Sequence, residues 1–266
     1  MPINLILEPK EFPLLFVHGH DFSKAVSAEY SLDTFSEMQQ KFENESIFLN
    51  GGSILLDNPE QVAGMWGKIN SPISLKTSYY FDIIGNADEK KLVQAKTDNI
   101  DTYALRLNEI IKIVKLKTNR EKVNLVAHSM GGLVVRKYLQ IYGEADINKI
   151  IMITAPNNGI SGNSLTYCSF FGSGAECNDM NQDGLFIDKL NKNNNFGIPV
   201  YNIIGIGCDT NGEDGDWIVT QSQAYLNATN VNNIFVNGTC GATDFFHSDI
   251  LKTHNYPEVY EIVKNA

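Results

Sequence analysis

Residues 124–139 read NLVAHSMGGLVVRKYL, a stretch in which an apolar run passes abruptly into a helical pattern. The run KVNLVA (122–127) is typical of a buried strand, and the residues after Ser129 have the apolar spacing of a helix. A residue at so tight a strand-to-helix bend has strained backbone, so its neighbours two positions away must be small. Ala127 and Gly131 meet that need. The stretch therefore predicts a strand–turn–helix unit that presents the Ser129 hydroxyl.

The beginning of this helix favours chemistry at Ser129. A helix N-terminus offers unpaired N–H groups and the positive end of the helix dipole beside the hydroxyl. We expect the Met130 N–H to point to the space where a substrate oxyanion develops, and Gly132 to let the helix pack closely. A serine followed two residues later by glycine is common. Within AHSMGG at a strand-to-helix junction, it indicates a nucleophile rather than a helix cap.

Length and composition predict a soluble protein with one large domain, residues 1–266. The chain is 43% hydrophobic and 20% charged, which is typical of globular proteins. A net charge of −10 without a dense Lys/Arg block argues against nucleic acid as a partner. No apolar run reaches the roughly 18 residues that span a bilayer, so we expect no transmembrane segment.

Short apolar runs alternate with longer amphipathic segments, a pattern that indicates parallel strands joined by helices. We expect helices at 33–43, from Ile100 to Val114 with Asp98 as N-cap, from Ser129 to near Gly143, and at the C-terminus from Pro257. Residues 44–75 and 157–197 are rich in Asn, Gly and Ser, and we expect irregular insertions there. The predicted strands are 13–17, 78–81, 122–127, 149–154, 199–206 and 233–238.

The motif around Ser129 resembles the G-x-S-x-G motif of serine lipases and esterases of the α/β-hydrolase fold, with Ala127 in place of the first glycine. Some small bacterial lipases share that alanine. The resemblance implies a mostly parallel central sheet flanked by helices, with a small cap or lid insertion at 157–197. Only about 21–96 lacks a matching pattern. Further matching segments are LLFVHGH (14–20), ITAPNNG (153–159), NDM…LFIDKLN (178–191), DWIVTQSQA (216–224) and HSDIL…PEVYEIV (247–263).

The resemblance also implies a catalytic triad in the chain order serine, acid, histidine. His247 precedes the final helix, where the family places its base, and His254 is the alternative. The acid belongs in the loop after the strand 199–206. Asp216 matches the family position there, and Asp214 is the runner-up.

The backbone N–H groups of His20 and Met130 are the expected oxyanion donors, because His20 follows the His-Gly turn of the family. We expect no cofactor and no metal. Asp179 begins a run that resembles a calcium loop, but its twelfth position is Leu190, where a bidentate glutamate is required.

The four cysteines form no CxxC pair, which argues against a zinc site. Two disulfides, 168–177 and 208–240 among the three possible pairings, are the favoured interpretation, and four buried thiols are the alternative. Disulfides imply an oxidising compartment. Since the N-terminus lacks the features of a signal peptide, we expect a secreted or extracytoplasmic domain that has lost its leader.

These observations predict a secreted serine hydrolase that cleaves carboxylic esters, with lipid (acylglycerol) esters first, through an acyl-enzyme. Contact with a lipid interface is then expected to be transient, and Tyr167, Phe170 and Phe171 offer apolar surface for a lid. One alternative is a thioesterase, amidase or lipid-anchor deacylase that uses the same triad. Another is a catalytically silent binding protein of this fold.

Overall fold

The structure is a computed structural model that describes residues 12–21, 27–56, 72–85, 89–171, 173–192, 194–241 and 244–266. Within these residues seven strands form one sheet in the order β11-β8-β7-β6-β1-β3-β2, and every neighbouring pair is parallel. The predicted parallel sheet is therefore confirmed. Its strands are β1 (Leu14–Val17), β2 (Leu49–Ile54), β3 (Ile73–Thr77), β6 (Val123–His128), β7 (Ile147–Ile153), β8 (Asn195–Ile206) and β11 (Thr229–Asn237).

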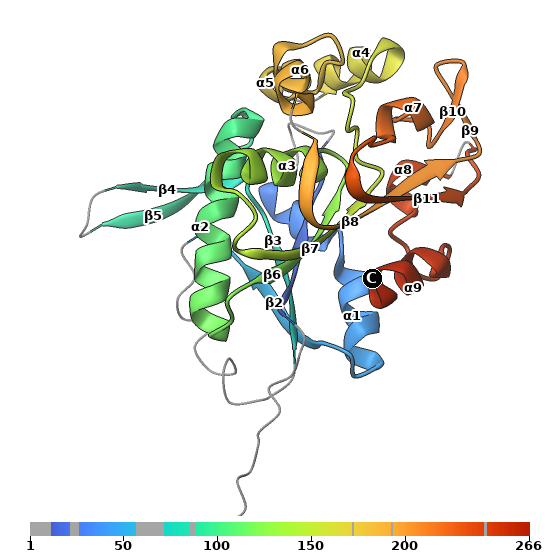
Figure 1. The fold of residues 1–266 in the computed structure, drawn as a ribbon. Helices are drawn as coiled ribbons and strands as arrows, with labels where there is room; N and C mark the ends of the chain where they lie inside the picture. Colours follow the sequence, from blue (N-terminus) through green and yellow to red (C-terminus); the bar gives the residue numbers. More distant parts are fainter. Residues whose placement is uncertain are drawn as a thin grey trace, which may run out of the picture.

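Helices cover both faces of this sheet (Figure 1). Strand β1 is buried throughout and alternates between two apolar clusters. Leu15 and Val17 pack in the cluster that contains α2 and α3, and Leu14 and Phe16 pack in the cluster of α1 and α9. Burial on both faces explains why the central strands are continuous apolar runs. The covering helices are α1 (Ser36–Asn44), α2 (Ile100–Thr118), α3 (Met130–Tyr142) and α9 (Pro257–Asn265).

The start of α2 differs by one residue from the prediction. Asn99, rather than Asp98, is the N-cap, and its side chain accepts a hydrogen bond from the Thr102 N–H at 2.9 Å. Asp98 instead accepts from Arg106 at 2.5 Å. An asparagine caps a helix about as well as an aspartate, so the aspartate is available for the ion pair.

The predicted strand at 78–81 is wrong in position. The strand is β3 (Ile73–Thr77), and Tyr79 and Tyr80 lie in the turn that follows it. Both tyrosines are fully buried, which gives this turn the apolar character of a strand. The expectation of an irregular 44–75 is also corrected, because β2 and the start of β3 fall within it. Residues 57–71 lie outside the described residues.

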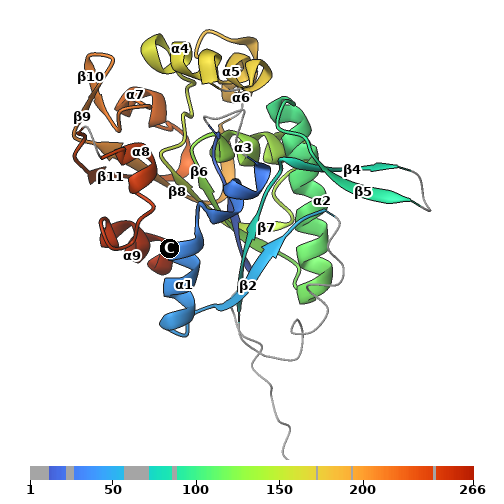
Figure 2. The ribbon, with the colours of Figure 1, turned by 180° about the vertical axis from the view of Figure 1, so that it is seen from behind.

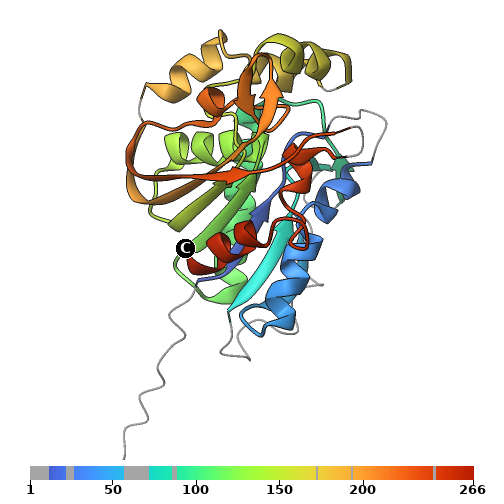
Figure 3. The same ribbon diagram turned by 90° about the vertical axis from the view of Figure 1, so that its right-hand side faces the viewer.

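The insertion at 157–197 is helical rather than irregular. It contains α4 (Gly162–Phe171), α5 (Gly174–Met180) and α6 (Leu185–Asn191), which we call the cap. Figure 3 shows the cap at one end of the sheet, above α3. Arg136 of α3 is buried and donates hydrogen bonds to the Asn157 carbonyl at 2.8 Å and to the Asn191 side chain at 2.5 Å. A buried arginine paired with both flanks anchors the cap to the core.

Two hairpins were not predicted from the sequence, because their strands are short and mixed in polarity. Strand β4 (Phe81–Gly85) pairs with β5 (Lys90–Gln94) and projects from the body (Figure 2). Strand β9 (Cys208–Thr210) pairs with β10 (Glu213–Gly215).

None of the helices in the described part of the chain has the length and hydropathy of a membrane span. The remaining elements are η1 (Ala28–Asp33), α7 (Gln221–Ala224) and α8 (Phe246–Asp249).

Candidate active site

Ser129 lies on strained backbone between β6 and α3. Its φ is 52° and its ψ is −128°, a combination that non-glycine residues rarely adopt. A Cβ at Gly131 would lie 2.3 Å from the His18 carbonyl oxygen, and one at Gly132 would lie 2.5 Å from Ala155 Cβ. Both glycines are therefore required by close packing, and the bend holds the Ser129 side chain at the end of the sheet.

Three side chains from distant segments meet at this bend. The Ser129 Oγ lies 2.9 Å from His247 Nε2, and His247 Nδ1 lies 2.7 Å from Asp216 Oδ2. A carboxylate only accepts, so Nδ1 carries the proton, and Nε2 of the neutral ring accepts from the serine hydroxyl. This is the geometry in which an imidazole can remove the proton of a serine.

The other oxygen of Asp216 is held by main-chain N–H groups. Oδ1 accepts from Ile218 at 3.0 Å and from Val219 at 2.7 Å. The His247 and Asp216 side chains are each only 1% exposed. Fixed donors on one oxygen keep the other aimed at His247, so the loop 216–219 positions the acid by itself.

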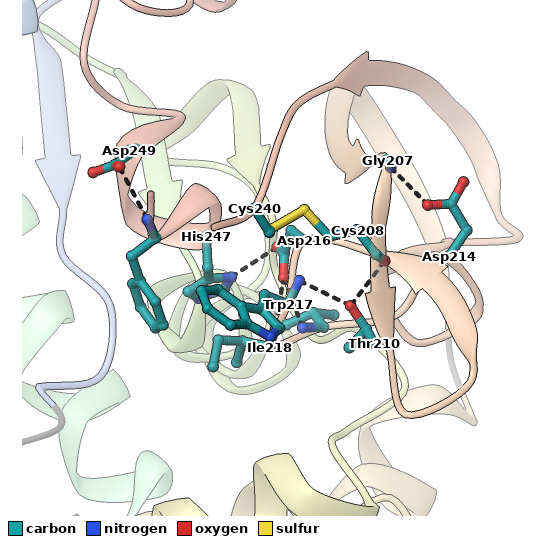
Figure 4. The surroundings of a disulfide bond; sticks show 12 residues. Gly207, Cys208, Thr210, Asp214, Asp216, Trp217, Ile218, Cys240, His247 and Asp249 are labelled. Carbon is teal, nitrogen blue, oxygen red and sulfur yellow. Dashed lines mark hydrogen bonds and ion pairs between the residues drawn. A yellow bond between two sulfur atoms is a disulfide. The ribbon is translucent and has the colours of Figure 1, made fainter. Parts of the chain in front are cut away.

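A disulfide ties together the loops that carry Asp216 and His247. Cys208 of β9 is bonded to Cys240, which follows β11, and the bond lies beside both side chains (Figure 4). The predicted pairing is present, as is the pairing of Cys168 with Cys177. The bond adds a covalent restraint between the ends of two neighbouring parallel strands.

The alternative acid and base lie elsewhere. Asp214 is on β10, points away from His247 and accepts from the Gly207 N–H at 2.6 Å (Figure 4). His254 is exposed and pairs with Glu37 at 2.9 Å. Neither contacts the Ser129–His247 pair, so geometry favours Asp216 and His247.

The turn of His18, Gly19 and His20 follows β1 and lies against the serine. A Cβ at Gly19 would approach Ser129 Cβ to 2.8 Å. The Tyr79 hydroxyl donates to the His18 carbonyl at 2.9 Å and to the Gly19 carbonyl at 3.3 Å. His18 Nδ1 lies nearer to the Gly19 carbonyl oxygen, at 2.7 Å. Because a trans peptide places N–H opposite C=O, His18 and Tyr79 together set the direction of the His20 N–H. We call residues 18–20 the oxyanion turn, after the role expected for the His20 N–H.

Sequence reasoning missed the role of Tyr79. The signal for it was the tyrosine pair in SYYF (78–81), two aromatic hydroxyl groups in a run that looked like a buried strand. A buried tyrosine hydroxyl needs a partner, and here it finds the carbonyls of the turn. Which carbonyls it reaches depends on the packing of β1 beside β3.

Two further histidines near the site are held uncharged. Burial lowers the pKa of His18 to about 3, and its ring stacks on Tyr79 at 3.9 Å. Burial, followed by the charge of His247, lowers the pKa of His128 to about 3. The His128 Nε2–H donates to the His247 carbonyl at 2.7 Å. Both rings thus serve as neutral hydrogen-bonding groups at physiological pH.

A comparison of the sequence with known protein families also gives a match. Residues 89–265, more than half of the chain, match the family described as alpha/beta hydrolase of unknown function (DUF915). The chain belongs to this family. None of the curated proteins matches the sequence.

Solved structures share the fold of this hydrolase. Lipase B of Aspergillus fumigatus has a TM-score of 0.59 at 12% identity over 100% of this chain and 55% of its own. Phospholipase PlaB of Legionella pneumophila has 0.64 at 14%, over 96% and 59%. The mature lipase BlEst2 of Bacillus licheniformis has 0.59 at 13%, over 96% and 93%. The chain thus spans little more than half of the first two proteins, and identities this low show the fold alone.

A cavity of about 410 Å³ lies beside the oxyanion turn of this hydrolase. That volume is within the range of small-molecule sites, roughly 300–1,000 Å³. Its wall combines the turn with His128 and Ser248, the chain neighbours of Ser129 and His247. Besides the turn, the lining includes Tyr30, Thr34, His128, Ser248 and Leu251.

One cluster in the described residues has the composition of a metal site. Ligand atoms of His20, Cys168 and Cys177 all lie within 4.8 Å of one another. The two sulfurs are joined in a disulfide, however, and a metal requires thiolates. The donor set therefore does not fit a metal ion.

Proposed function

We propose that this hydrolase cleaves carboxylic esters through an acyl-enzyme, with lipid (acylglycerol) esters as the first substrate class. The observation that carries the proposal is the continuous hydrogen-bonded series from Ser129 through His247 to Asp216, at 2.9 and 2.7 Å. A serine hydroxyl is a weak nucleophile without such a base, and the series supplies one.

In the proposed reaction the Ser129 oxygen attacks the ester carbonyl while His247 Nε2 takes its proton. Asp216 stabilises the resulting imidazolium. The N–H groups of His20 and Met130 donate to the oxyanion of the tetrahedral intermediate. His247 then protonates the leaving alcohol. A water molecule attacks the acyl-enzyme by the same steps, releases the acid and restores Ser129.

Three observations support lipids as the substrate class. The structural neighbours include proteins named as lipases and a phospholipase. The cavity beside the oxyanion turn can hold part of an ester. Trp217 and Phe245, next to the acid and near the base, are exposed with ring centroids 6.1 Å apart. Exposed aromatic rings of this kind suit an apolar substrate.

The two disulfides support an extracytoplasmic location. We therefore propose that the enzyme is secreted and meets lipid interfaces transiently. The cap supplies one exposed aromatic side chain, that of Tyr167. The side chains of Phe170 and Phe171, the other two residues predicted for a lid, lie outside the described residues.

The decisive experiment measures hydrolysis of p-nitrophenyl esters from acetyl to palmitoyl, in parallel with Ser129→Ala. We expect Ser129→Ala to lose about 10⁴-fold or more in kcat, with a profile rising toward longer acyl chains in the wild type. A fluorophosphonate probe should label wild type and spare Ser129→Ala. No turnover and no labelling of folded wild type would support a silent binding protein. Faster turnover of matched thioesters or amides would replace the ester proposal by the corresponding alternative.

A further inference from the structure

A second buried pair of histidine and carboxylate includes a residue of the oxyanion turn. His20 Nδ1 is 2.7 Å from Glu176 Oε2, and the two side chains are 1% and 2% exposed. His20 belongs to the oxyanion turn and Glu176 to α5 of the cap. The pair therefore joins the cap directly to the residue whose N–H is a proposed oxyanion donor.

Glu176 is itself fixed from a second direction. Its Oε1 accepts from the Tyr103 hydroxyl of α2 at 2.5 Å. Burial, with the charge of Glu176, raises the pKa of Tyr103 far above its ordinary value, so the hydroxyl remains a donor. One carboxylate thus accepts a hydrogen bond from Tyr103 of α2 and pairs with the imidazole of His20.

Helix α5, which carries Glu176, has a second contact with α2 that does not involve the oxyanion turn. Asp179 Oδ2 accepts from the Ile100 N–H at 2.8 Å, at the first residue of α2. Asp179 therefore anchors α5 as Glu176 does, but it has no contact with His20. This difference makes Asp179 a matched control.

The His20 imidazole is not directed at the serine. Its Nε2 faces Cys168 Sγ at 3.7 Å, and that sulfur is bonded to Cys177, the neighbour of Glu176. A ring enclosed between a disulfide and a carboxylate cannot exchange a proton with substrate. It can, however, fix the position of its own backbone.

We propose that Glu176 is a positioning residue for the oxyanion hole. The cap carboxylate holds the His20 imidazole, and through it keeps the His20 N–H aimed at the oxyanion formed at Ser129. The inference rests on the proposed ester hydrolysis, in which that N–H is a donor. The turn is then held at two places, at its carbonyls by Tyr79 and at its last side chain by Glu176.

Such a role has a kinetic signature. An oxyanion donor acts in the transition state, where it must lie about 2.7–3.1 Å from the oxyanion, so its displacement lowers kcat and leaves KM nearly unchanged. Removing one donor outright costs about 10²–10³-fold in kcat. We expect Glu176→Ala, which displaces the donor without deleting it, to lose roughly 10- to 100-fold.

The test compares Glu176→Ala, Glu176→Gln and Asp179→Ala with the wild type on the best p-nitrophenyl ester. Two further quantities are measured for each variant. One is the affinity for a trifluoromethyl ketone, whose adduct with the serine carries an oxyanion, and the other is the melting temperature. We expect Glu176→Ala to lose kcat and ketone affinity together at constant KM, and Glu176→Gln to regain part of both. Asp179→Ala should lower the melting temperature and keep kcat.

Tyr103→Phe provides the test if Glu176→Ala does not fold. It removes one hydrogen bond to the carboxylate, so we expect a smaller loss of kcat and ketone affinity, again at constant KM. If the wild type is active and the Glu176, Tyr103 and Asp179 variants all have the same kcat and ketone affinity, the positioning role is overturned. The proposed ester hydrolysis is not affected by that result. A wild type without turnover that depends on Ser129 overturns the ester hydrolysis as well.

Discussion

The site contains two buried histidine–carboxylate pairs with the same Nδ1–oxygen distance and different surroundings. His247 with Asp216 and His20 with Glu176 each have an Nδ1–oxygen distance of 2.7 Å, and all four side chains are buried. The difference lies at the other ring nitrogen. Nε2 of His247 faces the Ser129 hydroxyl at 2.9 Å, and Nε2 of His20 faces a disulfide sulfur at 3.7 Å. The partner of Nε2, rather than the pair itself, decides whether such a dyad can move a proton.

The two pairs also differ in how the carboxylate is held. Asp216 accepts hydrogen bonds from the N–H groups of the residues two and three positions later, so its support is local in sequence. Glu176 is held by the hydroxyl of Tyr103 on α2, a separate element. The position of the Asp216 carboxylate therefore does not depend on the packing of distant elements, whereas the position of Glu176 depends on the docking of the cap.

The largest expected effect comes from the acid of the first pair. Asp216→Asn keeps the size of the side chain but removes the charge that orients and stabilises His247, and we expect kcat to fall by about 10⁴-fold. Asp214→Asn, in the same loop and without contact to His247, should stay within a few-fold of wild type. Steady-state kinetics on one ester measure both variants. Equal losses in the two would contradict the choice of Asp216.

The two disulfides provide the next comparison, because one closes a separation of 32 residues and the other of 9. From loop entropy, replacing Cys208 and Cys240 by serine should lower the free energy of unfolding by about 4 kcal/mol, and replacing Cys168 and Cys177 by about 2.5 kcal/mol. Denaturant titrations measure this order.

Activity separates the two disulfides further. Without 208–240 the loops of Asp216 and His247 lose their link, and without 168–177 the segment that carries Glu176 is less restrained. We expect kcat to fall in both serine double variants when they are assayed fully folded. An unchanged kcat without 168–177 would mean that the docking of α5 alone holds Glu176.

The smallest effect concerns pH and the two neutral histidines near the serine. The pKa of His18 and of His128 is lowered by burial from 6.5 to about 3. The unfolded chain therefore binds more protons between these values, and stability is lost as pH falls below about 6.5. Each histidine contributes a slope of up to about 1.4 kcal/mol per pH unit.

Denaturant titrations from about pH 7 to about pH 5 measure that slope. His128→Asn removes one of the two groups, so the slope of the unfolding free energy against pH should decrease by the contribution of one proton. His18 remains in this variant, so part of the decline should persist. An unaltered slope in His128→Asn would show that His128 is not the group that resists protonation.

Much of the fold was predictable because its signals are local. The central strands are buried on both faces and read as apolar runs, and the bend at Ser129 needs small neighbours that a short motif displays. Strand β2 escaped prediction because LNGGSI, at the edge of the sheet, has neither an apolar run nor a clear alternation. Helix α4 was not predicted for a similar reason, since Asn, Gly and Ser dominate its flanks, whereas α6 falls in the segment 178–191 that resembles the cap region of the family.

The amino-acid sequence by itself determined the class of fold and the strained serine, because both depend on neighbours a few positions away. The order of the three residues proposed as a triad came from the resemblance of short motifs along the chain to those of a known family. Only the tertiary structure decided that Tyr79 and Glu176 contact the oxyanion turn and that Tyr103 holds Glu176. These residues come from separate elements, and the bonds of a buried polar group depend on which elements pack around it. No local pattern in the chain records that choice.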